Sequence, residues 1–531
     1  MQIVGKRKMG GEILSGLLGG TLSLTVSTLV VKLLGLIYKI PLASVLGDEG
    51  MGYFNSAYTV YAFFYLLCTA GVPKAVMILV SEAKAEGRAE MERKIVRVAS
   101  ILFLSLGAVV TAIFIVFSAP LALLIGNSRS AYTMLAIAPS IIFISLSGVI
   151  RGYLSANMLL LDIAVSQVIE GAGKLAFGLL FATLGKRMNM PLEMLSAMTI
   201  LGVTLGAGLG LLYLLVCSKI KINRENIGQN DKIQASREII KRILSISIPI
   251  TVSAAIMSVT NIIDLGLIMR SLSYIGYSEN DASALYGNYT TLAVPMFNLA
   301  ISIITPISVA YLPILTRCAV SGNTEGLIRT ERGALDFTAI LSAPMTVGMM
   351  VFAKEILGLL FPSSEIKLGA ALLVLIAAAI PFSSLLLVTN TSLEAQGCVK
   401  APLVSMIFGS LAKIVISFLL ITKTELGILG APIGTVGTYA VGLFVSLIIY
   451  GKRFKRSLPI MAIYLPPYLV AAASILLARA VYDQLYFIID GRALLLVCIA
   501  LAALIYLGLL TFFGILSSKK IGELAKYTKR G

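Results

Sequence analysis

The sequence predicts an all-α polytopic membrane protein of about 14 transmembrane helices, and three observations carry this prediction. Hydrophobic residues make up 58% of the 531 residues, whereas charged residues make up only 13%. Apolar runs of roughly 20 residues, each long enough to cross a bilayer core as a helix, recur along the whole chain. The polar stretches between these runs are too short to bury a core, so we expect no soluble domain.

The predicted spans follow from apolar length alone. They lie near residues 14–38, 52–72, 97–118, 131–150, 162–184, 195–218, 243–269, 285–307, 334–353, 370–390, 402–421, 426–450, 460–481 and 493–516.

Basic residues gather in alternate loops, and this sets the predicted orientation. Most of the 43 Lys and Arg residues fall in loops of one side, with clusters at 6–8, 219–242 and 519–530. Because cytoplasmic loops carry such an excess, we expect a multi-pass protein with both termini in the cytoplasm. The net charge of +17 is divided between these loops, so we expect no nucleic-acid partner.

An internal repeat predicts two lobes. The pattern S-x6-LGLI-x-K at residues 27–39 recurs as S-x6-LGLI-x-R at 258–270, and Val-Ser with a later Lys at 165–174 recurs at 404–413. Six spans in each copy keep the orientation, so the copies are parallel repeats with a substrate cavity between them. Spans thirteen and fourteen have no counterpart and are appended.

These boundaries define the predicted domains. They are an N-lobe at 1–220, a cytoplasmic linker at 221–242, a C-lobe at 243–451, and the two appended helices with a cytoplasmic tail at 452–531.

Lys32 is the first candidate for a substrate-binding residue. It lies inside the first predicted span, which holds no acidic residue. An isolated ammonium at membrane depth is costly, so we favour a cavity-lining role over a structural pair with an acid on another helix. Asp264, next to the matching position of span seven, could pair with Lys32 or bind a coupling cation or proton, and both alternatives stay open.

Further candidates occupy matched positions of the two copies. Lys39 and Arg270 end spans one and seven, where they either contact substrate or anchor the helix at the interface. Tyr53, Asn55 and Asn288 place polar edges near helix starts, for sugar hydroxyls or for packing.

Lys174 and Lys413 are equivalent by the repeat but differ in their surroundings. Glu170 stands four residues before Lys174, so we predict that the two form a structural ion pair. Gly409 stands at the matching place before Lys413, which is therefore the better candidate for a cavity charge. Arg151 falls just after a predicted span, and we assign it a surface or hinge role.

Several chemistries are excluded or disfavoured by residue content. The chain has no histidine, and its five cysteines show no metal-ligand or disulfide spacing. It has no phosphate-binding loop and no nucleophile with a base. We therefore predict no enzyme, no metal and no cofactor, with coupling to a monovalent cation or to the membrane potential left open.

Three stretches resemble one family. They are Lys32-Leu-Leu-Gly35, LGDEGMGYFNSAYTVYAFFYLLCTAGVPKAV and RGYLSANMLLLDIAVSQVIEGAGKLAFGLL. They are similar to the SpoVB/YtgP branch of the multidrug/oligosaccharidyl-lipid/polysaccharide exporter superfamily, and the resemblance covers the full chain. It implies two six-helix lobes of the MATE/MurJ type, alternating access, and basic residues such as Lys32 and Arg270 facing a central cavity.

The resemblance also implies a cargo. We expect a flippase in the bacterial cytoplasmic membrane, acting as a monomer on an anionic lipid-linked oligosaccharide such as lipid II, in cell-wall synthesis or sporulation. The appended helices would supply an apolar groove for the lipid tail. The alternatives are a cation-coupled drug antiporter of the MATE type and a non-transport scaffold for cell-wall or spore assembly.

Overall fold

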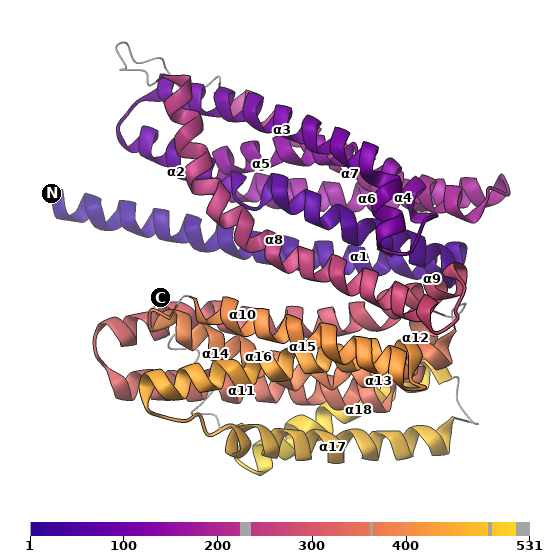
Figure 1. Ribbon diagram of the computed structural model, residues 1–531. Helices are drawn as coiled ribbons and strands as arrows, with labels where there is room; N and C mark the ends of the chain where they lie inside the picture. Colours follow the sequence, from indigo (N-terminus) through magenta and orange to yellow (C-terminus); the bar gives the residue numbers. More distant parts are fainter. Residues whose placement is uncertain (1, 223–234, 362–364, 399, 487–490, 517–531) are drawn as a thin grey trace. The chain divides into compact units, whose positions relative to one another are not determined.

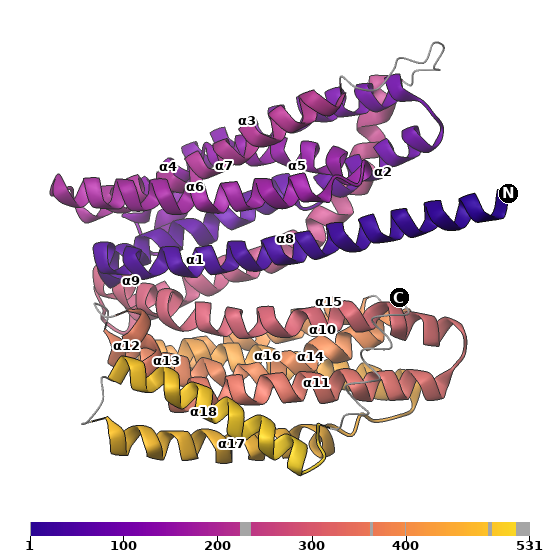
Figure 2. The same cartoon turned by 180° about the vertical axis from the view of Figure 1, so that it is seen from behind.

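The computed structural model describes residues 2–222, 235–361, 365–398, 400–486 and 491–516, without some side chains inside these ranges, including those up to residue 26 and that of Lys32. The described residues are almost wholly helical and contain no strand. Twelve stretches among them are long and apolar enough to cross a membrane. Figures 1 and 2 show the helices from two sides. The predicted all-α fold is confirmed, and every predicted span falls on helix. The number 14 stays a prediction.

The chain divides into two compact units, residues 1–287 and 288–531. The helices of the first unit are α1 (Gln2–Thr69), α2 (Val72–Ala85), α3 (Ala89–Leu124), α4 (Ser130–Ile137), α5 (Ser140–Ala156), α6 (Leu160–Arg187), α7 (Leu192–Ile222), α8 (Ser236–Tyr274) and α9 (Glu279–Asn288).

Unit 2 begins with the last residue of α9. It continues with the π-helical turn η1 (Tyr289–Ala293), α10 (Val294–Val320), α11 (Thr324–Val351), α12 (Ala353–Leu360), α13 (Ile366–Ala377), α14 (Ala379–Ala395), α15 (Ala401–Lys423), the 3-10 turn η2 (Gly427–Leu429), α16 (Gly430–Phe454), α17 (Ile460–Leu485) and α18 (Gly491–Phe512).

The first two predicted spans form one kinked helix, α1. Its backbone leaves the helical conformation only at Gly47, where φ is 64° and ψ is −179°. A positive φ is readily adopted by glycine, so one residue changes the chain direction without a longer loop. The predicted short loop between these spans is thus reduced to a kink.

The boundary between units differs from the boundary between predicted lobes. Helix α8, expected to open the C-lobe, packs against α1, α2 and α3 and belongs to unit 1. The chain then passes into unit 2 inside a continuous helical stretch, Glu279–Val320. The assignment of α8 to a C-lobe therefore remains a prediction from the repeat.

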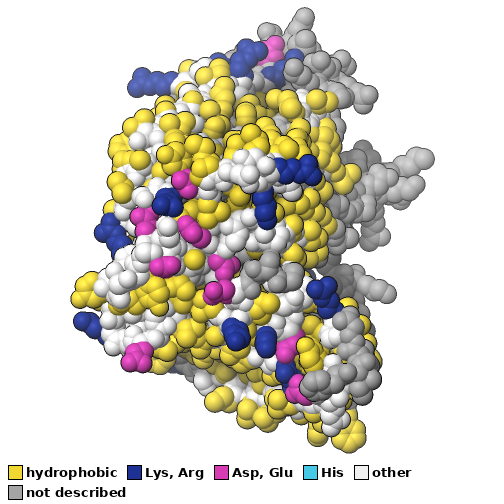
Figure 3. Space-filling view, turned by 90° about the vertical axis from the view of Figure 1, so that its right-hand side faces the viewer, with side chains coloured by type: hydrophobic (Ala, Val, Ile, Leu, Met, Phe, Trp, Pro, Cys, Tyr) yellow, Lys and Arg dark blue, Asp and Glu magenta, His cyan; other side chains and the backbone are white. Residues whose placement is uncertain are grey.

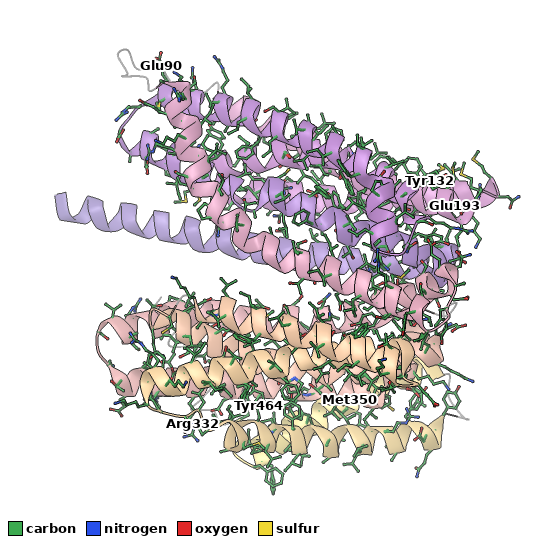
Figure 4. The ribbon with its side chains drawn as sticks, viewed as in Figure 1. Glu90, Tyr132, Glu193, Arg332, Met350 and Tyr464 are labelled. Atoms are coloured by element: carbon green, nitrogen blue, oxygen red, sulfur yellow. The ribbon has the colours of Figure 1, made fainter. Side chains whose placement is uncertain are left out.

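Within each unit, most helices run side by side, so their ends lie at two opposite ends of the unit. In unit 1, Figure 4 shows Glu90, at the start of α3, at one end, and Tyr132 and Glu193, on α4 and α7, at the other. In unit 2, Arg332 and Met350 lie toward the two ends of α11. Helix α17 packs against α11 and α18, and its Tyr464 stacks on Tyr468 at 6.1 Å between ring centroids.

Candidate functional site

Unit 1 contains a charged cavity of about 360 Å³ between α1, α5, α6 and α7. We call it the unit 1 cavity. Its polar wall is made by three tyrosines of one helical face of α1, by one residue of α5 and by three residues of α6, namely Tyr58, Tyr61, Tyr65, Arg151, Gln167, Glu170 and Lys174.

Close packing of α6 on α7 positions the two charged residues that α6 contributes to the cavity. A Cβ on Gly206 of α7 would lie 2.6 Å from the carbonyl oxygen of Glu170 and 2.7 Å from the backbone nitrogen of Lys174. Only a glycine lets the two backbones approach this closely, as small residues do between membrane helices. Gly202, one turn before it, makes a similar contact, because a Cβ there would lie 2.4 Å from the backbone nitrogen of Gly178.

Glu170 forms an ion pair with Arg151, at 2.8 Å between Oε2 and a guanidinium nitrogen. The predicted pair with Lys174 is wrong, although the spacing of four residues allows it. The Arg151 side chain is only 14% exposed, and its Nε is buried without a hydrogen-bond partner in the described part of the chain. The planar guanidinium fork matches the geometry of a carboxylate and is more weakly hydrated than an ammonium, so Arg151 is the better partner for Glu170 in a buried ion pair.

Lys174 is held by aromatic rings instead. Its Nζ lies 4.7 Å from the ring centroid of Tyr58 and 5.4 Å from that of Tyr38. Such cation–π contacts stabilise an ammonium without cancelling its charge. With Arg151 and Lys174 against the one carboxylate of Glu170, the described lining carries more positive than negative charge.

A ladder of rings runs along α1 beside these charges. Phe54, Tyr58, Tyr61 and Tyr65 follow one another with centroid distances of 6.4, 5.7 and 6.0 Å. Their spacing of three or four residues places them on one face of the helix. This spacing is present in the sequence, but Tyr58, Tyr61 and Tyr65 are not among the predicted site residues.

Arg151 lies in a different place from the one that the sequence predicts. The predicted span ended at residue 150, where the apolar run ends, but α5 continues to Ala156. Arg151 therefore lies inside the helix and lines the cavity, so the predicted surface role is wrong.

The predicted residues of α1 have mixed outcomes. Lys32 is on α1, but its side chain lies outside the described residues, as does any pairing with Asp264. Lys39 and Asn55 are brought together, because the ammonium donates to Asn55 Oδ1 at 3.4 Å. The buried Tyr53 donates its hydroxyl to Glu49 and contacts Asn280 Oδ1 at 3.3 Å, so it belongs to a polar cluster with α9.

The remaining predicted residues do not line the unit 1 cavity. Arg270 is exposed on α8 and donates from Nε to the carbonyl of Leu124 at 2.8 Å. Asn288 is buried and donates to the carbonyl of Glu365 at 3.2 Å. Asp264 and Lys413 are half-buried on α8 and α15, and Lys413 lies near Tyr439. Their substrate roles stay predictions.

A search of known families decides the identity of the chain. The "Polysaccharide biosynthesis protein" family matches residues 17–319, which is more than half of the sequence, and the MatE family matches residues 286–419. The chain belongs to the polysaccharide biosynthesis protein family. This places it in the exporter superfamily that its sequence resembles.

Individual relatives agree with this membership. The chain is 25% identical to "Stage V sporulation protein B" of Bacillus subtilis (strain 168), with 95% of this chain and 96% of the relative covered. It is 24% identical to "Lipid II flippase MurJ" of the same organism, with 84% and 85% covered.

Solved structures share the fold. "Lipid II flippase MurJ, inward closed conformation" superposes with a TM-score of 0.68 at 17% identity, covering 92% of this chain and 98% of that structure. An inward-facing MATE multidrug transporter gives a TM-score of 0.64 at 15% identity, covering 82% and 98%. Family and fold together make the chain a multi-pass membrane transporter of this superfamily.

Proposed function

We propose that the protein is a flippase that moves an anionic lipid-linked cell-wall precursor, of the lipid II class, from the inner to the outer leaflet by alternating access. The observation that carries this proposal is the donor excess of the unit 1 cavity. Arg151 and Lys174 supply cationic donors, and Glu170 is the one acid of the described lining. Arg151 retains a buried N–H with no acceptor in the described structure.

A pyrophosphate matches this arrangement chemically. It brings several acceptor oxygens and negative charge, so it would use the spare Arg151 donor and the Lys174 ammonium. In a cleft of low dielectric, these interactions replace part of the hydration that the headgroup loses. An organic cation would be repelled by the same groups, so the geometry supports the lipid-linked anion over a drug cation.

Unit 2 offers a feature that supports a lipid-bearing cargo. An apolar cavity of about 240 Å³ lies between α11, α17 and α18, lined by residues such as Met345, Ile475 and Ala502. An alkyl or prenyl chain is a ligand of matching polarity. The two relatives named as a lipid II flippase and a sporulation protein support a cell-wall precursor as cargo.

The proposal is tested by translocation of lipid II in a flippase-depleted bacterium that expresses this chain. Wild type should restore growth and surface exposure of lipid II. The double variant R151Q/K174Q should lose both, since two charge-assisted contacts of about 1.5–3 kcal/mol each disappear. From the sequence, K32A and K413A are also expected to abolish complementation.

The control is K186A, because Lys186 is exposed at the end of α6 and lies outside the cavity lining. Each variant must reach wild-type levels in the membrane. Full translocation by R151Q/K174Q at equal abundance would contradict the anionic-cargo proposal.

A further inference from the structure

Unit 2 has a charged cavity of its own, at one end of the appended helices. It measures about 640 Å³ and lies between α12, α13, α17 and α18. Its polar lining includes Lys354, Glu355, Arg479, Tyr482, Asp483 and Arg492. Figure 3 faces the ends of the helices on this side and shows basic and acidic side chains gathered among hydrophobic ones.

Arg479 is fully committed to the wall of this cavity. Its guanidinium binds Glu355 at 2.8 Å and Asp483 at 3.0 Å and 3.1 Å, from separate nitrogens. The rings of Phe352 and Tyr482 lie against it, at 5.6 and 5.5 Å from their centroids. This one cation therefore neutralises much of the charge of both acids of the lining and fixes their positions.

Two cations of the lining remain outside this network. Lys354 of α12 and Arg492 of α18 are exposed, and neither forms an ion pair with any residue that the structure describes. They come from different helices and share one cavity. The lining thus holds three cations and two acids. Lys354 and Arg492, the two cations outside the ion-pair network, can both donate hydrogen bonds to a ligand.

We propose that this cavity binds a phosphate ester, with Lys354 and Arg492 holding its oxygens. Lysine acts on phosphate as a compact point charge, and arginine presents a planar fork to two oxygens. The volume falls in the usual range for small-molecule sites of about 300–1,000 Å³, so it has room for more than a bare ion. The cavity lies where α17 ends and α18 begins, and the end of a membrane-spanning helix reaches the headgroup region, so the phosphate can come from a lipid headgroup or from a free phosphate.

The experiment uses the full chain in detergent and counts bound ligand by native mass spectrometry. The probes are phosphatidylglycerol, diacylglycerol with the same tails but no phosphate, and inorganic phosphate as competitor. We expect phosphatidylglycerol to bind wild type and to bind K354Q/R492Q about tenfold more weakly, a loss near 1.4 kcal/mol. Diacylglycerol should bind both equally and weakly.

The matched control is K186Q/R187Q, which removes one exposed Lys and one exposed Arg from the end of α6 in unit 1. It should bind like wild type, and the charge-keeping K354R/R492K should retain most binding, which separates charge from folding. Competition by millimolar inorganic phosphate would assign the site to free phosphate, and its absence to a lipid headgroup. The proposal would be overturned if K354Q/R492Q bound phosphatidylglycerol as tightly as wild type does, or if wild type bound diacylglycerol as tightly as phosphatidylglycerol.

Because binding is read without transport, this result is independent of the cargo proposed for the unit 1 cavity. If the protein binds phosphatidylglycerol at this site but does not move lipid II, the phosphate-ester site is supported and the proposed flippase function is contradicted.

Discussion

Unit 1 and unit 2 share a scaffold, and the clearest match is between α5 and α14. Both have 17 residues, and α14 starts 239 residues after α5. At this same spacing, Asn157 donates to the buried Glu92 at 3.2 Å and Gln396 donates to the buried Glu331 at 3.1 Å. Each unit thus ties the start of one helix to the end of another through a buried carboxylate and an amide.

The two charged residues that pair in the unit 1 cavity, Arg151 and Glu170, are not repeated in unit 2. At the spacing of 239 residues, Arg151 corresponds to Asn390 and Glu170 to Gly409. Asn390 accepts a hydrogen bond from Ser446 at 2.7 Å, a neutral contact in place of the ion pair. The comparison teaches that the two units share this scaffold, whereas the ion pair of Arg151 with Glu170 has no counterpart at the matching positions of unit 2.

The glycines show how a carboxylate could be accommodated. In unit 2, Gly409 itself supplies the close approach, because a Cβ there would lie 2.5 Å from the carbonyl of Thr438 on α16. In unit 1 the glycine is on the other helix, as Gly206 of α7, so position 170 is free to carry a side chain. The close contact thus depends on a glycine of α15 in unit 2 and on a glycine of α7 in unit 1.

The largest expected effect concerns the shared element. E331A should destabilise the protein by about 3–5 kcal/mol, because Gln396, Tyr450 and Ser392 all donate to this buried carboxylate. E92A should also destabilise it strongly, and thermal unfolding in detergent measures both. The exposed E325A on α11 is the control and should change little. A strong effect in one unit alone would break the equivalence of the two carboxylates.

The unshared element is tested by exchanging residues between the units. R151N/E170G gives unit 1 the residues of unit 2 at both positions and leaves no unpaired charge of the pair. We expect folding to survive, with a cost of about 1 kcal/mol for glycine in a helix, while lipid II translocation falls about 100-fold. Translocation near the wild-type rate would mean that the charge difference between units has no functional role.

A third variant concerns the helix contact. G206V places a β-branched side chain on α7 at the point where the α6 backbone packs against it. The added side chain meets the α6 backbone at Glu170 and Lys174, and overpacking of this kind costs about 1–3 kcal/mol. Thermal unfolding should show the loss. G35V is the control, because no atom lies within 4 Å of a Cβ at Gly35.

The smallest effect is expected for the ring over Lys174. Y58L removes one cation–π partner, worth about 0.5–1 kcal/mol at a partly exposed site, and leaves the tyrosine ladder around it. Translocation should slow about threefold, since the ammonium loses position and keeps its charge. Y132L changes another exposed tyrosine of unit 1 and should leave the rate unaltered.

The fold was predictable because hydropathy and helix length are local properties that survive in the structure. The charged cavity was only partly predictable. Lys174 was found through the repeat, but its partner depends on which helices touch, and the four-residue spacing to Glu170 could not reveal that α5 brings Arg151 there. Arg151 was not predicted as a cavity residue, because the apolar run ends at residue 150 while the helix α5 continues to Ala156.

The passage between units has a geometric consequence. The unit boundary falls between Gly287 and Asn288, and the π turn Tyr289–Ala293 follows it at once, just before Pro295, which has no N–H to donate. A π turn holds one residue more than an α turn. Exchange of this turn for an α turn would rotate every later side chain of the helix by about 100° about its axis. A change in the hydrogen bonding of this single turn would therefore alter which face of the following helix each side chain lies on.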